Sequence, residues 1–203
     1  MVPLGLGAVR RTEPAPVDAV RERLELGERP VLLTLSAKRP HKNLLALIDA
    51  LAAIPAERRP VLVAPGYPTA HEQELRGRAA SLGIAADVRF PAWVSTAELE
   101  TLWRLARAFV FPSLYEGFGL PVLEAMARGV PVTCSDASSL PEVAGDAALL
   151  FDPRSERAIR EAIELILGDE ALATRLRERG LARAAEFTWR RTAELTLASY
   201  ARA

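Results

Sequence analysis

Residues 107–153 read RAFVFPSLYEGFGLPVLEAMARGVPVTCSDASSLPEVAGDAALLFDP and contain three short apolar runs. The runs are RAFVF (107–111), VPVTCS (130–135) and AALLF (147–151). They are continuous rather than alternating, which is typical of strands buried on both faces. Pro121 opens a helical segment between the first two runs, because proline suits a first helical turn. The stretch therefore predicts a strand, a helix and further strands of a parallel sheet.

The same alternation extends toward the N-terminus. Three more apolar runs are VLLTLS (31–36), VLVAP (61–65) and ADVRF (86–90). Segments with helical periodicity lie between the runs, at 43–54 and after Thr69 and Ser95. Strands that alternate with helices indicate an α/β fold. We predict a Rossmann-like, doubly wound parallel sheet of about six strands, with helices on both faces and extra C-terminal helices.

Both ends of the chain differ from this alternating region. Residues 155–168, 169–187 and 188–203 are rich in Arg, Glu, Ala and Leu, and predict three consecutive helices with solvated faces. Trp189 and Tyr200 in the last helix are expected to be packing anchors. Residues 1–29 contain three prolines and predict a linker with an isolated helical piece. We therefore expect one domain over 30–187, between a linker and a C-terminal helix over 188–203.

Composition excludes several classes of function. The chain has 26 Lys and Arg against 26 Asp and Glu, so no overall basic field indicates nucleic-acid binding. Cys134 is the single cysteine, which excludes an intrachain disulfide and a zinc cluster, and we expect it in a buried strand. No apolar run reaches the roughly 18 residues of a membrane span. The N-terminal segment MVPLGLGAVRR is a poor signal peptide.

Polar residues before the helical segments have the spacing of N-terminal caps. A hydroxyl residue followed three positions later by glutamate fits a capping box, and this pattern occurs at Thr69–Glu72, Ser95–Glu98 and Ser139–Glu142. Asn43 is the expected N-cap of the helix at 43–54. We predict that these side chains satisfy the first amides of their helices.

Two glutamates and a glycine loop follow the run RAFVF. Seven residues separate Glu116 from Glu124, and Gly117-Phe118-Gly119 lies between them. In a doubly wound sheet such a loop lies beyond the carboxyl ends of the strands, where ligands bind. The glycines permit close approach of backbone to a ligand. The amides at the helix start, those of Gly119, Leu120 and Val122, favour a phosphate or a developing anion.

The two carboxylates add acceptors for hydroxyl groups. Glu124, one turn into the helix, can accept hydrogen bonds from two adjacent hydroxyls, as a ribose offers. Glu116 can accept them from hydroxyls of a second ring. Taken singly, Glu116 is most simply a turn residue and Glu124 a charge that favours the helix dipole. Together with the glycine loop, they favour a site for a ligand with phosphates and hydroxyls.

A second loop, SAKRPHKN (36–43), follows the run VLLTLS and faces the same edge of the sheet. Lys42 in this loop can supply a cation that neutralises a diphosphate. Alone, such a loop is usually a solvated turn, and His41 a surface residue. The glycine fingerprint G-x-G-x-x-G of a dinucleotide-binding enzyme is absent after this strand, which argues against a dehydrogenase.

The ordered set of motifs closely resembles the C-terminal half of a retaining glycosyltransferase of the GT-B architecture, in glycosyltransferase family 4, the glycosyl transferases group 1. Four segments carry the resemblance: MVPLGLG, LSAKRPHKN, VRFPAWVSTAELETLWRLARAFVFPSLYEGFGLPVLEAMARGVPV and SSLPEVAGDAALLFDP. The match as a whole covers almost the entire chain, from about Val2 to Tyr200. A lone pair of glutamates at this spacing would be weak, whereas the long ordered match is specific.

The resemblance implies a role for each matching residue. As catalytic residues, Glu116 would contact hydroxyls of the donor sugar and Lys42 would stabilise the diphosphate leaving group. Glu124 would hold the nucleotide ribose. The other donor-binding residues would be Gly117, Phe118, Gly119 and Leu120, through their backbone, and Val94, in a segment that would border the base. Negative charge grows on the diphosphate during transfer, and preorganised cations and amides stabilise it.

The resemblance also implies the function and the partners. The chain would be the donor-binding half of a hexosyltransferase that acts with retention on a glycan, lipid or small-molecule acceptor. The donor would be a UDP-, GDP- or ADP-linked sugar, with no cofactor and no metal, since no D-x-D pair occurs. An N-terminal acceptor domain, to which the last helix would cross, is the expected partner, and the chain alone would be inactive. The implied setting is bacterial polysaccharide synthesis in the cytoplasm, with peripheral membrane contact through that other half.

Three sites depart from the family pattern. Ala37 stands where many relatives carry arginine, so a second phosphate cation is either missing or replaced by Lys38 or Arg39. His41 also stands in place of a common arginine, and Pro91-Ala92 replace a common glycine. The alternative function is a non-catalytic nucleotide-binding or interaction module that works with a separate subunit. Ala37 counts for this alternative, whereas the intact glutamate pair counts against it.

Overall fold

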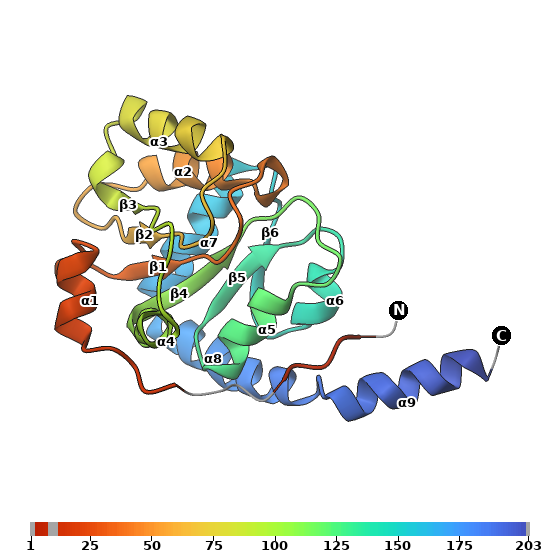
Figure 1. Ribbon diagram of the computed structural model, residues 1–203. Helices are drawn as coiled ribbons and strands as arrows, with labels where there is room; N and C mark the ends of the chain where they lie inside the picture. The colour runs from red at the N-terminus through yellow and green to blue at the C-terminus, as the bar shows by residue number, and fades with distance from the viewer. Residues whose placement is uncertain (1–2, 8–11, 202–203) are drawn as a thin grey trace.

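The computed structural model describes residues 3–7 and 12–201, and shows a sheet between two layers of helices (Figure 1). Six parallel strands follow the order β3-β2-β1-β4-β5-β6. Their bounds are β1 Val31–Leu33, β2 Val61–Val63, β3 Val88–Arg89, β4 Ala106–Phe111, β5 Val132–Ser135 and β6 Ala148–Phe151. Each predicted apolar run overlaps one of these strands, so the predicted doubly wound sheet is confirmed.

Helices cover both faces because successive strand residues point to opposite faces of the sheet. In β1, Val31 and Leu33 belong to one apolar core and Leu32 to the other. The first core includes residues of α1 (Val17–Arg23), α4 (Thr96–Leu105), α5 (Leu120–Ala127) and α6 (Leu140–Ala144). The second includes residues of α2 (Leu44–Ala52), α3 (His71–Ser81) and α7 (Glu156–Gly168), and α8 (Glu170–Ala185) contributes to both. Two short 3-10 helices, η1 (Pro40–Lys42) and η2 (Ala85–Asp87), and α9 (Trp189–Tyr200) complete the described elements.

The predicted capping boxes have different outcomes. At α4 the box is confirmed, because the Glu98 amide donates to the Ser95 hydroxyl at 3.2 Å and the Ser95 amide donates to the Glu98 carboxylate at 2.7 Å. The boxes predicted at Thr69 and Ser139 are wrong, since neither side chain caps its helix. Both hydroxyls donate instead to carbonyls of distant loops. Tertiary contacts therefore determine the hydrogen bonds of these two hydroxyls, although local spacing had predicted bonds to their own helices.

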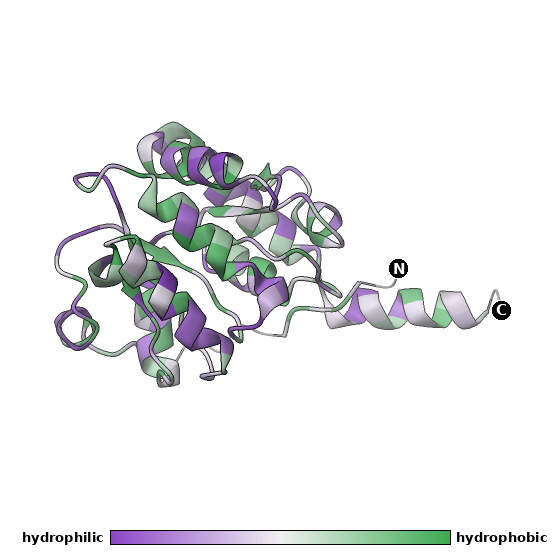
Figure 2. Cartoon of the chain, turned by 90° about the horizontal axis from the view of Figure 1, so that it is seen from above, coloured by the Kyte–Doolittle hydropathy of each residue, from purple (hydrophilic) through white to green (hydrophobic). Residues whose placement is uncertain are grey.

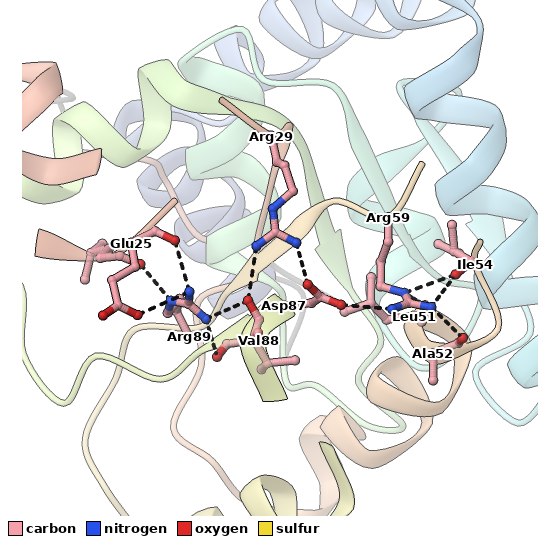
Figure 3. A network of polar contacts seen from close by, with 11 residues as sticks. Glu25, Arg29, Leu51, Ala52, Ile54, Arg59, Asp87, Val88 and Arg89 are labelled. Carbon is pink, nitrogen blue, oxygen red and sulfur yellow. Dashed lines mark hydrogen bonds and ion pairs between the residues drawn. The ribbon is translucent and has the colours of Figure 1, made fainter. Parts of the chain in front are cut away.

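A carboxylate joins two arginines at the amino end of the sheet (Figure 3). Asp87 precedes β3 and accepts hydrogen bonds from Arg29, before β1, and from Arg59, before β2. Arg59 also donates to the carbonyls of Leu51, Ala52 and Ile54 at the end of α2. The network thus holds the starts of three neighbouring strands, on the side opposite to the loops that carry the candidate site.

The region predicted to be a linker contributes to the core. Val20 of α1 is buried, and the Thr101 hydroxyl of α4 donates to the Ala15 carbonyl at 2.7 Å. Farther upstream, the Leu6 amide donates to the Phe187 carbonyl at 2.8 Å, which places residues 3–6 beside the junction of α8 and α9. The boundaries of the domain remain a prediction.

Helix α9 projects from the body of the molecule, and carries both hydrophobic and hydrophilic residues (Figures 1 and 2). Trp189 and Tyr200 are 57% and 76% exposed. Our expectation that they are packing anchors is therefore wrong for the described chain. Among the described helices, none has both the length and the apolar character that crossing a membrane requires.

Cys134 lies in β5 and is buried, as expected. Burial raises the pKa of its thiol to about 12, and the nearby Asp136 carboxylate adds to the shift. A thiol with so high a pKa is not a nucleophile at neutral pH, because the reactive species is the thiolate. The residue is therefore part of the apolar core.

Candidate functional site

The candidate site lies where the strand order reverses. Strand β1 pairs with β2 on one side and with β4 on the other. The chain leaves β1 and β4 in opposite directions around the sheet, and a crevice for ligands forms at such a switch point. The loops 34–43 and 112–119, which the sequence singled out, leave these two strands at their carboxyl ends.

The two residues predicted to be catalytic contact each other across this point. The Lys42 Nζ lies 2.6 Å from the Glu116 Oε1, and their side chains are only 16% and 13% exposed. The ammonium also lies 5.4 Å from the ring centroid of Phe111, at the end of β4. The structure therefore brings a cation and a carboxylate from two distant loops into one ion pair.

Asn43 fixes the position of the loop that carries Lys42. Its backbone is left-handed, with φ 58°, and its side chain makes no cap bond to α2, contrary to our expectation. The side-chain amide donates instead to the Pro112 carbonyl at 3.1 Å and to the Pro153 carbonyl at 2.7 Å. One amide group thereby ties together the loops that follow β1, β4 and β6.

Two serines outside the predicted site hold the backbone of Glu116. The Ser138 hydroxyl donates to the Glu116 carbonyl at 2.7 Å and accepts from the Glu116 amide at 3.3 Å. The Ser139 hydroxyl contacts the same carbonyl at 3.1 Å and the Phe118 carbonyl at 2.8 Å. Ser138 has a left-handed backbone, with φ 57°, which is uncommon for a residue other than glycine. Sequence reasoning missed both roles, because it used Ser139 as a helix cap and left Ser138 unassigned.

The two glycines of the loop have different tasks. Gly119 has φ 113°, a conformation that favours glycine, and a Cβ there would lie 2.7 Å from the Leu140 Cδ2, so the Leu140 side chain would have to shift. A Cβ at Gly117 would meet nothing within 4 Å. Between them, Phe118 packs edge-on against Phe187, with ring centroids 5.9 Å apart. Gly119 therefore shapes the loop, whereas Gly117 leaves open space beside it.

The start of α5 agrees with the sequence in part. Gly119 is the N-cap, and Leu120 and Pro121 form the first turn, as expected. The Val122 amide, however, donates to the Gly119 carbonyl at 3.0 Å. Our expectation that this amide faces a ligand is therefore wrong, because the first helical turn already uses it.

Glu124 lies on α5 and takes no part in the ion pair. Burial raises the pKa of its carboxyl above the usual 4.5, the Arg128 guanidinium opposes this shift, and the Glu100 carboxylate adds to it. Arg128 is itself held by Glu100, at 2.7 Å, and lies over the Trp103 ring. Within the described residues, no donor hydrogen-bonds to the Glu124 carboxylate, so its oxygens can accept hydroxyl groups.

Lys38, one of the two residues considered as a second phosphate cation, is bonded within the protein. Its side chain is fully buried, and its Nζ lies 2.5 Å from the Gly66 carbonyl and 3.3 Å from the Glu72 carboxylate. Burial lowers the pKa of the ammonium, and the neighbouring Glu72 opposes that shift. The Thr69 hydroxyl, which was wrongly predicted to form a capping box with Glu72, donates to the Lys38 carbonyl. Lys38 thus joins the loops after β1 and β2, while Arg39 is exposed.

The remaining predicted residue, Val94, is partly buried against the first core. It precedes the N-cap of α4, whereas the adjacent Trp93 is 68% exposed. Among the described His, Cys, Asp and Glu residues, no group of three or more has the arrangement of a metal site.

The fold and these loops define a Rossmann-like domain with a candidate ligand site at its switch point. Known proteins show the family to which this domain belongs. Residues 17–183 match the glycosyl transferases group 1 family, and the chain belongs to this family as a C-terminal domain. It is 37% identical over 190 residues to the O-antigen chain mannosyltransferase B of Escherichia coli, covering 92% of this chain and 50% of that protein. It is 35% identical to the MMP alpha-(1->4)-mannosyltransferase of Mycolicibacterium hassiacum, covering 85% and 43%. The chain thus spans about half the length of these two relatives.

Solved structures agree with this assignment. The fold superposes on a sucrose-phosphate synthase from Thermosynechococcus elongatus with a TM-score of 0.81 at 27% identity, covering 99% of this chain and 51% of that chain. The C-terminal domain of a glycosyl transferase group 1 family protein from Francisella tularensis gives a TM-score of 0.70 at 22% identity, covering 86% and 94%. The Rossmann-like fold of a GT-B glycosyltransferase domain is therefore established for this chain.

Proposed function

We propose that this chain is the donor-binding half of a retaining hexosyltransferase, and that a nucleotide-diphosphate sugar binds at the carboxyl ends of β1 and β4. The observation that carries the proposal is the pairing of Lys42 with Glu116 at the switch point. A cation for phosphate and a carboxylate for hydroxyls lie next to a glycine loop and a helix start, where such a ligand needs them.

Each part of the donor has a partner in this arrangement. The diphosphate lies against Lys42 and the start of α5, the sugar hydroxyls meet Glu116, and the ribose meets Glu124. Because negative charge develops on the diphosphate as the sugar leaves, a cation held in a mostly buried position stabilises the transition state more than one in water. The mannosyltransferase names of the relatives favour a mannosyl donor.

The same edge of the domain is suited to face an acceptor-binding half. Exposed large apolar side chains lie along this edge: Tyr67 after β2, Trp93 after β3, Leu114 and Tyr115 after β4, and Leu120 at the start of α5. A second domain that covers them would exclude water from the site. We therefore expect the chain alone to bind the donor weakly and to transfer no sugar. The alternative of a non-catalytic module is not favoured, because the named relatives are transferases.

Calorimetric titration with UDP, GDP and ADP tests the proposal. One nucleotide should bind, and Glu124→Ala should abolish its binding, because the ribose loses its acceptor. A matched control is Glu178→Ala, on α8. Binding that survives Glu124→Ala unchanged would contradict the assigned site. Appreciable sugar transfer by the chain alone would contradict the need for a second half.

A further inference from the structure

The ion pair between Lys42 and Glu116 joins two groups that the proposed function needs for separate parts of the donor. Lys42 is assigned to the diphosphate and Glu116 to the sugar. In the structure the Nζ and Oε1 lie 2.6 Å apart, a distance typical of a strong charge-assisted hydrogen bond. Among the described residues, no other carboxylate pairs with Lys42, and no other cation pairs with Glu116.

Both side chains extend from backbone that is fixed independently of the pair. The Glu116 amide and carbonyl are held by Ser138, and the carbonyl also by Ser139. The Lys42 amide donates to the Arg39 carbonyl at 2.9 Å, and the adjacent Asn43 is tied to two other loops. Side-chain rotation alone can therefore break the pair, without movement of the loops.

A diphosphate that takes Lys42 leaves the Glu116 carboxylate without its partner. This carboxylate is only 13% exposed, so water replaces the lost ammonium poorly, and it would lie close to a second anion. Hydroxyl groups of a bound sugar remove this penalty, because they donate hydrogen bonds to the carboxylate. Diphosphate and sugar should therefore each favour the binding of the other.

We propose that Glu116 competes with the diphosphate for Lys42, so that the site binds a nucleotide sugar in preference to a nucleoside diphosphate. The proposal rests on the proposed function and adds a specificity role to Glu116. It also gives the carboxylate a part in product release. Once the sugar has left, Glu116 recovers Lys42 and weakens the hold on the nucleoside diphosphate.

Glu116→Gln separates this role from simple sugar binding. Glutamine keeps the size and hydrogen-bonding capacity of the side chain and removes its charge. We would titrate wild type and variant with pyrophosphate, GDP and GDP-mannose, and in parallel with UDP and UDP-glucose. For the variant we expect diphosphate and nucleoside-diphosphate affinity to rise by up to about fivefold, the upper end of the range for exposed ion pairs. The preference for the nucleotide sugar over the nucleoside diphosphate should fall.

Two controls separate local competition from a general change in charge. Glu142→Gln removes the same charge from α6, where the side chain is exposed and follows Ser139 closely. It should leave the preference between the two ligands unchanged. Adding Lys42→Met to Glu116→Gln should cancel the gain, because the cation that the carboxylate competes for is then absent. Thermal unfolding checks that each variant is folded, and Glu116→Ala serves if the glutamine variant is not.

The outcomes distinguish this proposal from the proposed function. If the wild-type chain binds a nucleotide and Glu116→Gln binds the nucleoside diphosphate no more tightly, competition is refuted and the donor site remains. An equal gain in Glu142→Gln would also refute it, since the effect would then be one of overall charge. If neither wild type nor variant binds any of the five probes or ADP, both proposals fail together.

Discussion

The Ser139 hydroxyl donates a hydrogen bond of 2.8 Å to the Phe118 carbonyl, and so joins the first turn before α6 to the glycine loop before α5. These residues are 21 positions apart in the chain. The same hydroxyl lies 3.1 Å from the Glu116 carbonyl, so one buried oxygen atom contacts both carbonyls around Gly117. The conformation of the candidate site thus depends on a serine that contributes no group to the proposed ligand.

Ser139→Ala should lower both stability and nucleotide affinity. Removing the hydroxyl leaves the carbonyl of Phe118 without this donor, and an unsatisfied buried acceptor costs about 1–3 kcal/mol. Urea unfolding measures the loss, and calorimetry measures the weaker binding. Ser81→Ala is the control, because Ser81 bonds only to its own helix and is exposed, and it should change neither. Unchanged binding in a destabilised Ser139→Ala would show that the loop keeps its shape without this bond.

Ser138 offers a test of backbone strain by a matched pair of variants. Both Ser138→Gly and Ser138→Ala remove the hydroxyl, but only glycine adopts φ 57° without a steric penalty. The glycine variant should therefore be more stable than the alanine variant by about 1 kcal/mol. Thermal unfolding of the two proteins measures the difference directly. Equal stabilities would mean that the strain at this position is negligible.

The two loop glycines should respond differently to alanine. Gly119→Ala places a Cβ 2.7 Å from the buried Leu140 and forces a left-handed alanine, so unfolding free energy should fall by about 2 kcal/mol or more. Gly117→Ala meets no neighbour and should keep its stability. If the open space beside Gly117 receives the donor, its alanine variant should still bind the nucleotide sugar more weakly. Full affinity in Gly117→Ala would place the donor elsewhere along the loop.

The raised pKa of the Glu124 carboxyl should make nucleotide binding depend on pH. Burial raises its carboxyl pKa above 4.5, and hydroxyl groups donate best to the ionised form. Affinity should therefore fall as pH drops through this raised pKa, at a pH above 4.5. Glu124→Gln should weaken binding and remove that part of the pH profile, whereas titrations of the ligand phosphates remain in both proteins. An identical profile in wild type and variant would exclude Glu124 from the site.

The free energy of unfolding should depend on pH in the opposite direction. Between pH 4.5 and the raised pKa of Glu124, the folded state binds more protons than the unfolded chain. Ionisation of Glu124 therefore destabilises the folded state as pH rises.

The lowered pKa of the Asp87 carboxyl should make the protein lose stability in acid. Burial alone would raise the pKa of its carboxyl, but the hydrogen bonds from Arg59 and Arg29 outweigh burial and lower it below 3.8. The unfolded chain thus binds more protons in this range, so the stabilisation is complete above about pH 4 and is lost as pH falls through the lowered pKa. Asp87→Asn should cost about 2 kcal/mol at pH 7 and progressively less in acid. Urea unfolding from pH 7 to pH 2 measures this loss of stability. The control is Asp146→Asn, which removes a carboxylate from an exposed ion pair with Arg179 and should have little effect.

The sequence by itself determined the architecture. Six apolar runs separated by helical segments specify buried parallel strands, since continuous apolar residues are stable only where both faces of a sheet are covered. The same order places the loops with Lys42 and Glu116 at the carboxyl edge, because ligand loops of a doubly wound sheet follow its strands. The resemblance to the glycosyl transferases group 1 rests on these loops, and the family match agrees with it.

Only the tertiary structure decided which partners the polar side chains take. Thr69, Ser95 and Ser139 have the same spacing to a following glutamate, yet only Ser95 caps its helix. A hydroxyl can bond to a nearby amide or to a carbonyl of another loop, and local sequence shows only the first choice. The fold brings carbonyls of Lys38 and Phe118 within reach of the other two. For the same reason the contact of Lys42 with Glu116, 74 positions apart, became visible only once β1 and β4 lay side by side.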